Sequence, residues 1–124
     1  MKAKIAVVED NPDNRLLVWA ILDDHYEISE YETGVQAVDG LLDNIPDLVL
    51  LDISLPEMDG TEVLQWIRSQ AELDGLPVIA LTAHAMAGDR EKYLEQGFND
   101  YLTKPIVDED VLMDTIERWL PKSV

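Results

Sequence analysis

The sequence has no cysteine and few basic residues. Without a thiol there is no disulfide framework, thiol nucleophile or thiolate metal site to consider. Nine lysine and arginine residues stand against 26 aspartate and glutamate residues, which gives a formal net charge of −17. Such an excess of negative charge repels phosphate backbones and anionic lipids. We therefore expect no direct contact with nucleic acid or with a membrane surface.

Long apolar runs are also missing. Although 47% of the 124 residues are hydrophobic, no window approaches the roughly 18 uninterrupted apolar residues that a membrane-spanning helix needs. The apolar stretch within residues 1–9 is too short for a signal peptide, and no small-residue cleavage site follows it. We expect a single soluble domain over residues 1–124, located in the cytoplasm.

Five short runs rich in valine, isoleucine and leucine predict strands. They lie at Ala3–Val8, Glu27–Tyr31, Leu48–Leu51, Pro77–Leu81 and Tyr101–Leu102. The first and third runs are apolar without alternation, as in parallel strands covered on both faces. Between the runs, apolar residues recur at helical spacing near residues 16–21, 35–42, 63–67 and 111–120. The pattern predicts an α/β fold, a doubly wound (βα)5 chain with a five-stranded parallel sheet in the order 2-1-3-4-5, in a flavodoxin-like three-layer sandwich.

Three carboxylates directly follow apolar runs. Glu9 and Asp10 come after the first predicted strand and Asp52 after the third. The carboxyl ends of these two strands border the ligand crevice of this topology, so the three side chains should lie close together. Like charges at close range are costly to desolvate unless a cation or a proton intervenes. Taken singly, each residue would more simply begin a loop or cap a helix, but together they favour a hard divalent cation such as Mg²⁺.

Two other strand ends carry groups that could contact a phosphoryl oxygen. Lys104 follows the fifth predicted strand and could act as a compact positive charge. Thr82 follows the fourth predicted strand and offers a hydroxyl. An exposed turn for the lysine and an ordinary strand end for the threonine are the simpler interpretations of each residue alone.

Four segments in this order resemble the signature segments of two-component response-regulator receiver domains. They are Val8–Asn11, Leu51–Gly60, Leu81–Ala83 and Tyr101–Pro105. The resemblance spans almost the whole chain. It implies a phosphoryl-accepting signalling switch that takes the group from a sensor histidine kinase or a histidine phosphotransfer protein and changes shape to control a downstream protein target. It also implies that the chain is no enzyme beyond its own phosphorylation and dephosphorylation.

The resemblance assigns the metal and acceptor roles residue by residue. Asp52 matches the phosphoacceptor. Glu9 and Asp10 match the acidic pair that binds Mg²⁺, together with Asp52 and the backbone carbonyl of Ser54. Glu9 stands where an aspartate is frequent in the family, which leaves the detailed geometry at the metal open.

The resemblance likewise assigns the switch. Thr82 and Lys104 match the catalytic hydroxyl and ammonium that contact the phosphoryl group. Thr82, Tyr101, Lys104 and Pro105 match the residues that rearrange after phosphorylation. We expect Lys104 to matter for switching more than for folding. Ser54 and His84 match positions that tune the lifetime of the phosphoryl group.

Several alternatives remain open. The chain could act alone or as a domain of a hybrid kinase or longer regulator, and the segments 82–86 and 97–101 resemble hybrid-kinase receivers in particular. A haloacid-dehalogenase-type phosphatase would need a second acid two residues after its nucleophile, where this chain has Ser54. A flavodoxin-like cofactor carrier would meet repulsion from Glu9 and Asp10. No G-x-x-x-x-G-K segment for a nucleotide occurs.

Overall fold

The computed structural model describes residues 3–83, 89–104, 106 and 108–120. Its strands are Lys4–Val8 (β1), Glu27–Tyr31 (β2), Leu48–Asp52 (β3), Val78–Thr82 (β4) and Asp100–Thr103 (β5). All neighbouring strands pair in parallel, in the order β2-β1-β3-β4-β5. The predicted sheet order is therefore confirmed.

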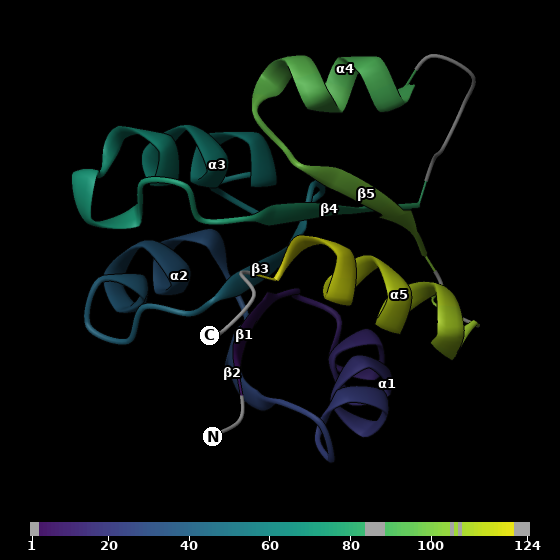
Figure 1. The fold of residues 1–124 in the computed structure, drawn as a ribbon. Coiled ribbons are helices and arrows are strands. Elements are labelled where there is room, and N and C mark those ends of the chain that lie inside the picture. Colours follow the sequence, from purple (N-terminus) through teal and green to yellow (C-terminus); the bar gives the residue numbers. More distant parts are fainter. Residues whose placement is uncertain (1–2, 84–88, 105, 107, 121–124) are drawn as a thin grey trace.

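Helices cover both faces of this sheet. They are Pro12–Leu22 (α1), Gly34–Leu41 (α2), Gly60–Ser69 (α3), Asp89–Gln96 (α4) and Glu109–Trp119 (α5), with a short 3-10 turn at Ala71–Leu73. Helices α1 and α5 pack against one face, whereas α2, α3 and α4 pack against the other (Figure 1). The chain thus forms the expected three-layer sandwich.

Burial explains why the central strands lack alternation. Every residue of β3 and β4 is buried, because successive side chains enter the two apolar layers in turn. On β3, for example, Leu51 belongs to the layer beneath α2, α3 and α4, and Leu50 to the layer beneath α1 and α5. A residue's place in a strand therefore fixes the side of the sheet on which its side chain begins.

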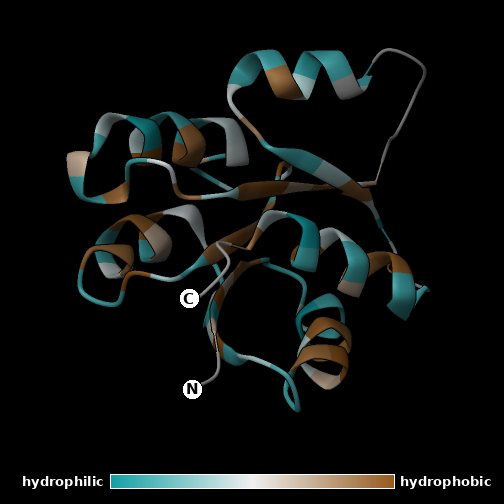
Figure 2. Cartoon of the chain, viewed as in Figure 1, coloured by the Kyte–Doolittle hydropathy of each residue, from teal (hydrophilic) through white to brown (hydrophobic). Residues whose placement is uncertain are grey.

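Helix α4 is the element that apolar spacing did not predict. Its sequence is almost wholly polar (Figure 2), and among its described side chains only Tyr93 is buried. The 3.6-residue pattern needs several apolar positions, and α4 supplies one anchor in place of a stripe. The rule that parallel strands need a crossover still placed a helix there.

Helix caps hold the loops at the carboxyl ends of the strands. The Asn11 side chain accepts hydrogen bonds from two backbone N–H groups in the first turn of α1, and Asp59 does the same for one N–H of α3. Gly60 begins α3 directly against β3, where a Cβ would lie 2.3 Å from the carbonyl oxygen of Asp52. Only glycine allows this approach, which folds residues 53–59 back over the end of β3.

Candidate functional site

The three predicted carboxylates converge at the carboxyl ends of β1 and β3. One oxygen from each of Glu9, Asp10 and Asp52 lies within 4.8 Å of the others. Adjacent pairing of the two strands, with Val8 opposite Leu51, brings these loops together. Glu9 and Asp52 are buried, with 0% and 1% of their surfaces exposed, whereas Asp10 is exposed. The cluster therefore has a buried floor and an open rim.

Lys104 reaches into the cluster from the end of β5. Its ammonium nitrogen lies 3.1 Å from Glu9 Oε1 and 3.0 Å from Asp52 Oδ2. The lysine follows β5, and its backbone N–H donates a 2.7 Å hydrogen bond to the carbonyl of Thr82 at the end of β4. The predicted proximity of Lys104 to the carboxylates is thus observed.

Burial and mutual charge set the protonation of the site. Burial, together with the neighbouring Asp52 carboxylate, raises the pKa of the Glu9 carboxyl to about 7, and Lys104 offsets only part of the rise. Burial also raises the pKa of Asp52, but the neighbouring Glu9 carboxyl, the hydrogen bond from the Ser54 N–H and the Lys104 ammonium outweigh it, so that this pKa is lowered. Burial lowers the pKa of Lys104, while its contacts with Asp52 and Glu9 more than reverse that. Asp52 therefore stays ionised at neutral pH.

The oxygen atoms of the site suit a hard cation. Glu9 Oε2 is buried and has no hydrogen-bond partner among the described residues. Asp52 Oδ2 contacts the Lys104 ammonium but accepts no well-directed hydrogen bond from the described part of the chain. Buried acceptors without partners are costly, and either a proton shared by the two carboxylates or a cation would satisfy them. An all-oxygen set with an open rim matches the preference of Mg²⁺, which keeps several waters.

Two residues of α1 that the sequence reasoning missed support the acidic pair. Asn14 Nδ2 donates a 2.9 Å hydrogen bond to Glu9 Oε1. Arg15 donates from Nη1 to the backbone carbonyl oxygens of Glu9 and Asp10, at 2.9 and 3.4 Å. The available signal was the cap at Asn11, since residues three and four positions after a cap return to the side of the preceding loop.

Two of the predicted switch residues, Thr82 and Tyr101, lie on β4 and β5. Thr82 is buried at the end of β4, and Tyr101 is half-buried on β5. A third residue, Tyr93 of α4, donates a 3.3 Å hydrogen bond from its hydroxyl to Thr82 Oγ1. Sequence reasoning missed Tyr93, whose only signal was an aromatic side chain in a polar window. The predicted residues Pro105 and His84 lie outside the described residues.

Ser54 contacts the phosphoacceptor position through its backbone. Its N–H donates a 3.0 Å hydrogen bond to Asp52 Oδ1, and its side chain is exposed. The expected role of its carbonyl as a metal ligand stays a prediction. The N–H contact fixes one Asp52 oxygen and leaves the other, Oδ2, facing Lys104.

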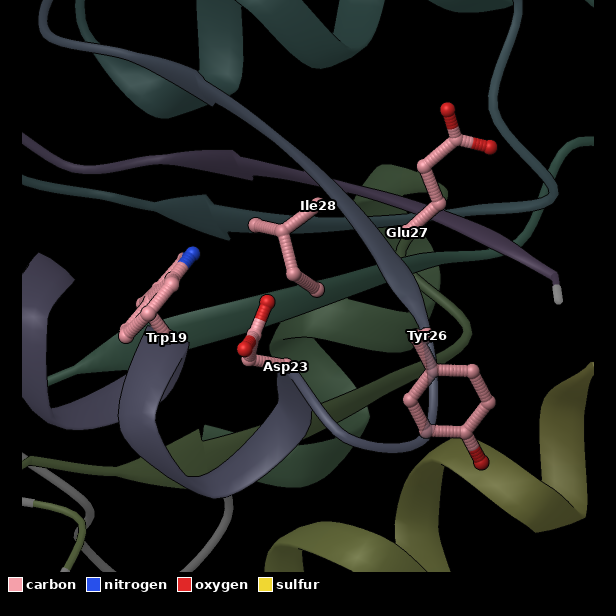
Figure 3. Close-up of a pocket in the computed structure, with 5 residues that line it drawn as sticks. All are labelled: Trp19, Asp23, Tyr26, Glu27 and Ile28. Carbon is pink, nitrogen blue, oxygen red and sulfur yellow. The ribbon is translucent and has the colours of Figure 1, made fainter.

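Two of the tryptophans differ in burial. Trp66 is partly buried against the core, whereas 41% of Trp19 is exposed. Trp19 lines a shallow groove with Asp23, Tyr26, Glu27 and Ile28. Figure 3 shows Trp19, Asp23 and Ile28 close together, while the Glu27 carboxylate points away from them. Residues 26–28 lie at the start of β2, the opposite end of the sheet from the carboxylates, so the groove is separate from the candidate site.

Comparison with known proteins identifies the family. The model of the response regulator receiver domain matches residues 5–117. The chain belongs to this family. Receiver domains are signalling modules of two-component and phosphorelay systems. Signalling within such a system is therefore the function of this receiver domain. Within the described residues, no helix is long and apolar enough to cross a membrane.

Similar receivers occur in proteins of very different length. Over 120 residues the chain is 42% identical to the sensor protein GacS of Pseudomonas syringae pv. syringae, covering 94% of this chain but only 13% of that protein. Over 107 residues it is 40% identical to the polar-differentiation response regulator DivK of Brucella ovis, covering 86% of this chain and 87% of DivK. The chain thus spans about an eighth of the sensor proteins that it matches and most of DivK.

A solved receiver structure carries the metal. The receiver domain of sensor histidine kinase PA1611 from Pseudomonas aeruginosa is 38% identical, with a TM-score of 0.86, and the match covers 96% of this chain and 98% of that one. That structure has a magnesium ion coordinated in its active-site cleft. The chemotaxis protein CheY4 of Vibrio cholerae is 26% identical, with a TM-score of 0.89, covering 97% of this chain and all of that chain.

Proposed function

We propose that Asp52 of this receiver accepts a phosphoryl group in a Mg²⁺-dependent reaction. The observation that carries the proposal is the contact between the Lys104 ammonium and two buried carboxyl groups, of which Asp52 stays ionised. An ionised carboxylate beside a fixed ammonium is both a nucleophile and an anion site.

The chain's own residues supply positioning and charge. An oxygen of Asp52 attacks the phosphorus atom, the bond from phosphorus to the donor's imidazole nitrogen breaks, and an acyl phosphate forms on Asp52. The Lys104 ammonium opposes the negative charge on the transferred group, and the Thr82 hydroxyl donates to one of its oxygens. Thr82, Tyr101, Lys104 and Pro105 would then rearrange as the switch.

The metal would be held by the carboxylates of Glu9, Asp10 and Asp52 and by the backbone carbonyl of Ser54. Bound Mg²⁺ would neutralise the carboxylates and the incoming phosphoryl oxygens. Glu9 Oε2 is buried and has no hydrogen-bond partner in the part of the chain that the structure describes, which supports this assignment, because a cation or its water would satisfy that atom.

The proposed partners are proteins. The donor would be a sensor histidine kinase or a histidine phosphotransfer protein, as the similarity to sensor kinases supports. The output would be contact with a downstream protein in the cytoplasm. The chemistry would be limited to the domain's own phosphorylation and dephosphorylation, without turnover of an external substrate.

Intact-protein mass after incubation with acetyl phosphate tests the proposal. We expect one phosphoryl adduct on the wild type in the presence of Mg²⁺, little without Mg²⁺, and none on Asp52→Asn. The matched control is Asp74→Asn, which changes an exposed aspartate remote from the carboxylate cluster and should be phosphorylated normally. Absence of an adduct on the folded wild type under every condition would refute the proposal.

A further inference from the structure

Tyr93 contacts two of the four residues that the proposed function places in the switch, Thr82 and Tyr101. It is 8% exposed and anchors α4 to the sheet. Its hydroxyl donates to Thr82 Oγ1 at 3.3 Å. Its ring centroid lies 5.7 Å from that of Tyr101, and Phe98 packs edge-on against it at 6.0 Å. These ring contacts fix the Tyr93 ring, so its hydroxyl meets Thr82 in a defined orientation.

We infer that Tyr93 is a positioning residue that holds the Thr82 hydroxyl in its resting arrangement. It thereby raises the free energy of the switched arrangement relative to the resting one. The inference rests on the proposed function, because it requires Thr82 to move toward a phosphoryl group on Asp52. It adds Tyr93, and with it α4, to the residues that determine how readily the domain accepts that group.

Strand alternation explains why the two positions of the hydroxyl exclude each other. Ala80 lies in the layer beneath α4, so Thr82, two residues later, begins on that side of the sheet. Leu50 lies in the opposite layer, so Asp52 begins on the side of α1 and α5. To reach a phosphoryl group on Asp52, the hydroxyl must turn away from the side of α4 and so leave Tyr93.

The hydrogen bond from Tyr93 therefore stabilises the resting arrangement selectively. Interactions made in only one of two states shift the equilibrium between them by their full free energy. A neutral hydrogen bond of this kind corresponds to a shift of about threefold to tenfold. Removing the hydroxyl of Tyr93 while keeping its ring should make phosphoryl-like ligands bind more tightly by that factor.

The test uses Tyr93→Phe and beryllium fluoride, which mimics a phosphoryl group on an aspartate carboxylate. Calorimetric titration at saturating Mg²⁺ should give about threefold to tenfold tighter binding than for the wild type. The affinity for Mg²⁺ alone should not change, because Tyr93 touches none of the carboxylates. Tyr26→Phe is the matched control, since Tyr26 is also buried but lies in the opposite layer, and it should leave both affinities unchanged. Unchanged or weaker beryllium fluoride binding by Tyr93→Phe would overturn the inference.

A double-mutant cycle with Thr82→Val identifies the route of the effect. If Tyr93 acts through the Thr82 hydroxyl, Tyr93→Phe should change nothing in the Thr82→Val background. An equal tightening in both backgrounds would overturn the inference. Binding by the wild type that Asp52→Asn abolishes upholds the proposed function whatever Tyr93 does. A folded wild type that binds no beryllium fluoride would overturn the proposed function and this inference with it.

Discussion

The Lys104 ammonium lies 3.1 Å from the buried Glu9 carboxyl, yet the pKa of Glu9 is raised to about 7. Burial and the nearby Asp52 carboxylate thus outweigh the ammonium. In the unfolded chain Glu9 would lose its proton near its ordinary pKa of 4.5. Between these values the unfolded chain releases the proton first as the pH rises, so rising pH disfavours the folded state.

We therefore predict that the metal-free wild type loses stability as the pH rises and that Glu9→Gln removes this loss. The wild type should lose about 2 to 3 kcal/mol relative to Glu9→Gln between pH 4.5 and pH 7. Urea unfolding in the presence of a chelator measures the difference. Glu95→Gln, at an exposed position on α4, should follow the wild type. An equal dependence of the free energy of unfolding on pH in wild type and Glu9→Gln would contradict the raised pKa of Glu9.

Asn14 should matter for metal binding because it fixes the Glu9 carboxylate. It donates to Oε1, which leaves Oε2, an atom without a partner among the described residues, as the oxygen available to a metal or its water. Asn14→Leu keeps the approximate size but removes the donor, and Mg²⁺ affinity should fall about tenfold. Calorimetric titration with MgCl₂ measures it.

The control for Asn14 is Asn11→Ala, which removes the cap of α1 without touching Glu9. This change should cost about 1 kcal/mol of stability and leave Mg²⁺ affinity nearly unchanged. If both variants weaken Mg²⁺ binding equally, Asn14 acts through the stability of α1 and not through Glu9.

The sequence was sufficient for the sheet and for the residues at its carboxyl edge. Strand order follows from the crossover rules, and strand ends then bring Glu9, Asp52 and Lys104 together. The contacts from Asn14 and Tyr93 could not be predicted in this way. They depend on the rotation of α1 and α4 about their axes, and among the described side chains of α4 only Tyr93 is buried to fix that rotation.

Lys104→Met should destabilise the metal-free protein. The substitution keeps the aliphatic length but leaves the buried Asp52 carboxylate without its cation, a change that costs about 3 kcal/mol. Saturating Mg²⁺ should recover much of the loss by supplying another positive charge. The two ion pairs thus predict a contribution of Lys104 to stability besides the expected role in switching. Thermal unfolding with and without Mg²⁺ measures both the loss of stability and its recovery. Lys92→Met, at an exposed position, is the control. Equal stability of Lys104→Met and wild type without metal would contradict this.

Two glycine substitutions separate steric contact from backbone strain. A Cβ on Gly60 would lie 2.3 Å from the Asp52 carbonyl oxygen and 2.7 Å from Ile53 Cα, so the loop that follows the phosphoacceptor must move. A Cβ on Gly75 would meet nothing within 4 Å, and alanine there would suffer only from the positive φ of 78°. We expect Gly75→Ala to cost about 1 kcal/mol and to keep normal phosphorylation. Gly60→Ala should cost about 3 kcal/mol and slow phosphorylation of Asp52 by acetyl phosphate, because the displaced backbone carries Asp52 and Ser54. Urea unfolding and intact-mass kinetics measure the two effects, and a Gly60→Ala variant with normal kinetics would show that the loop adapts without moving the acceptor.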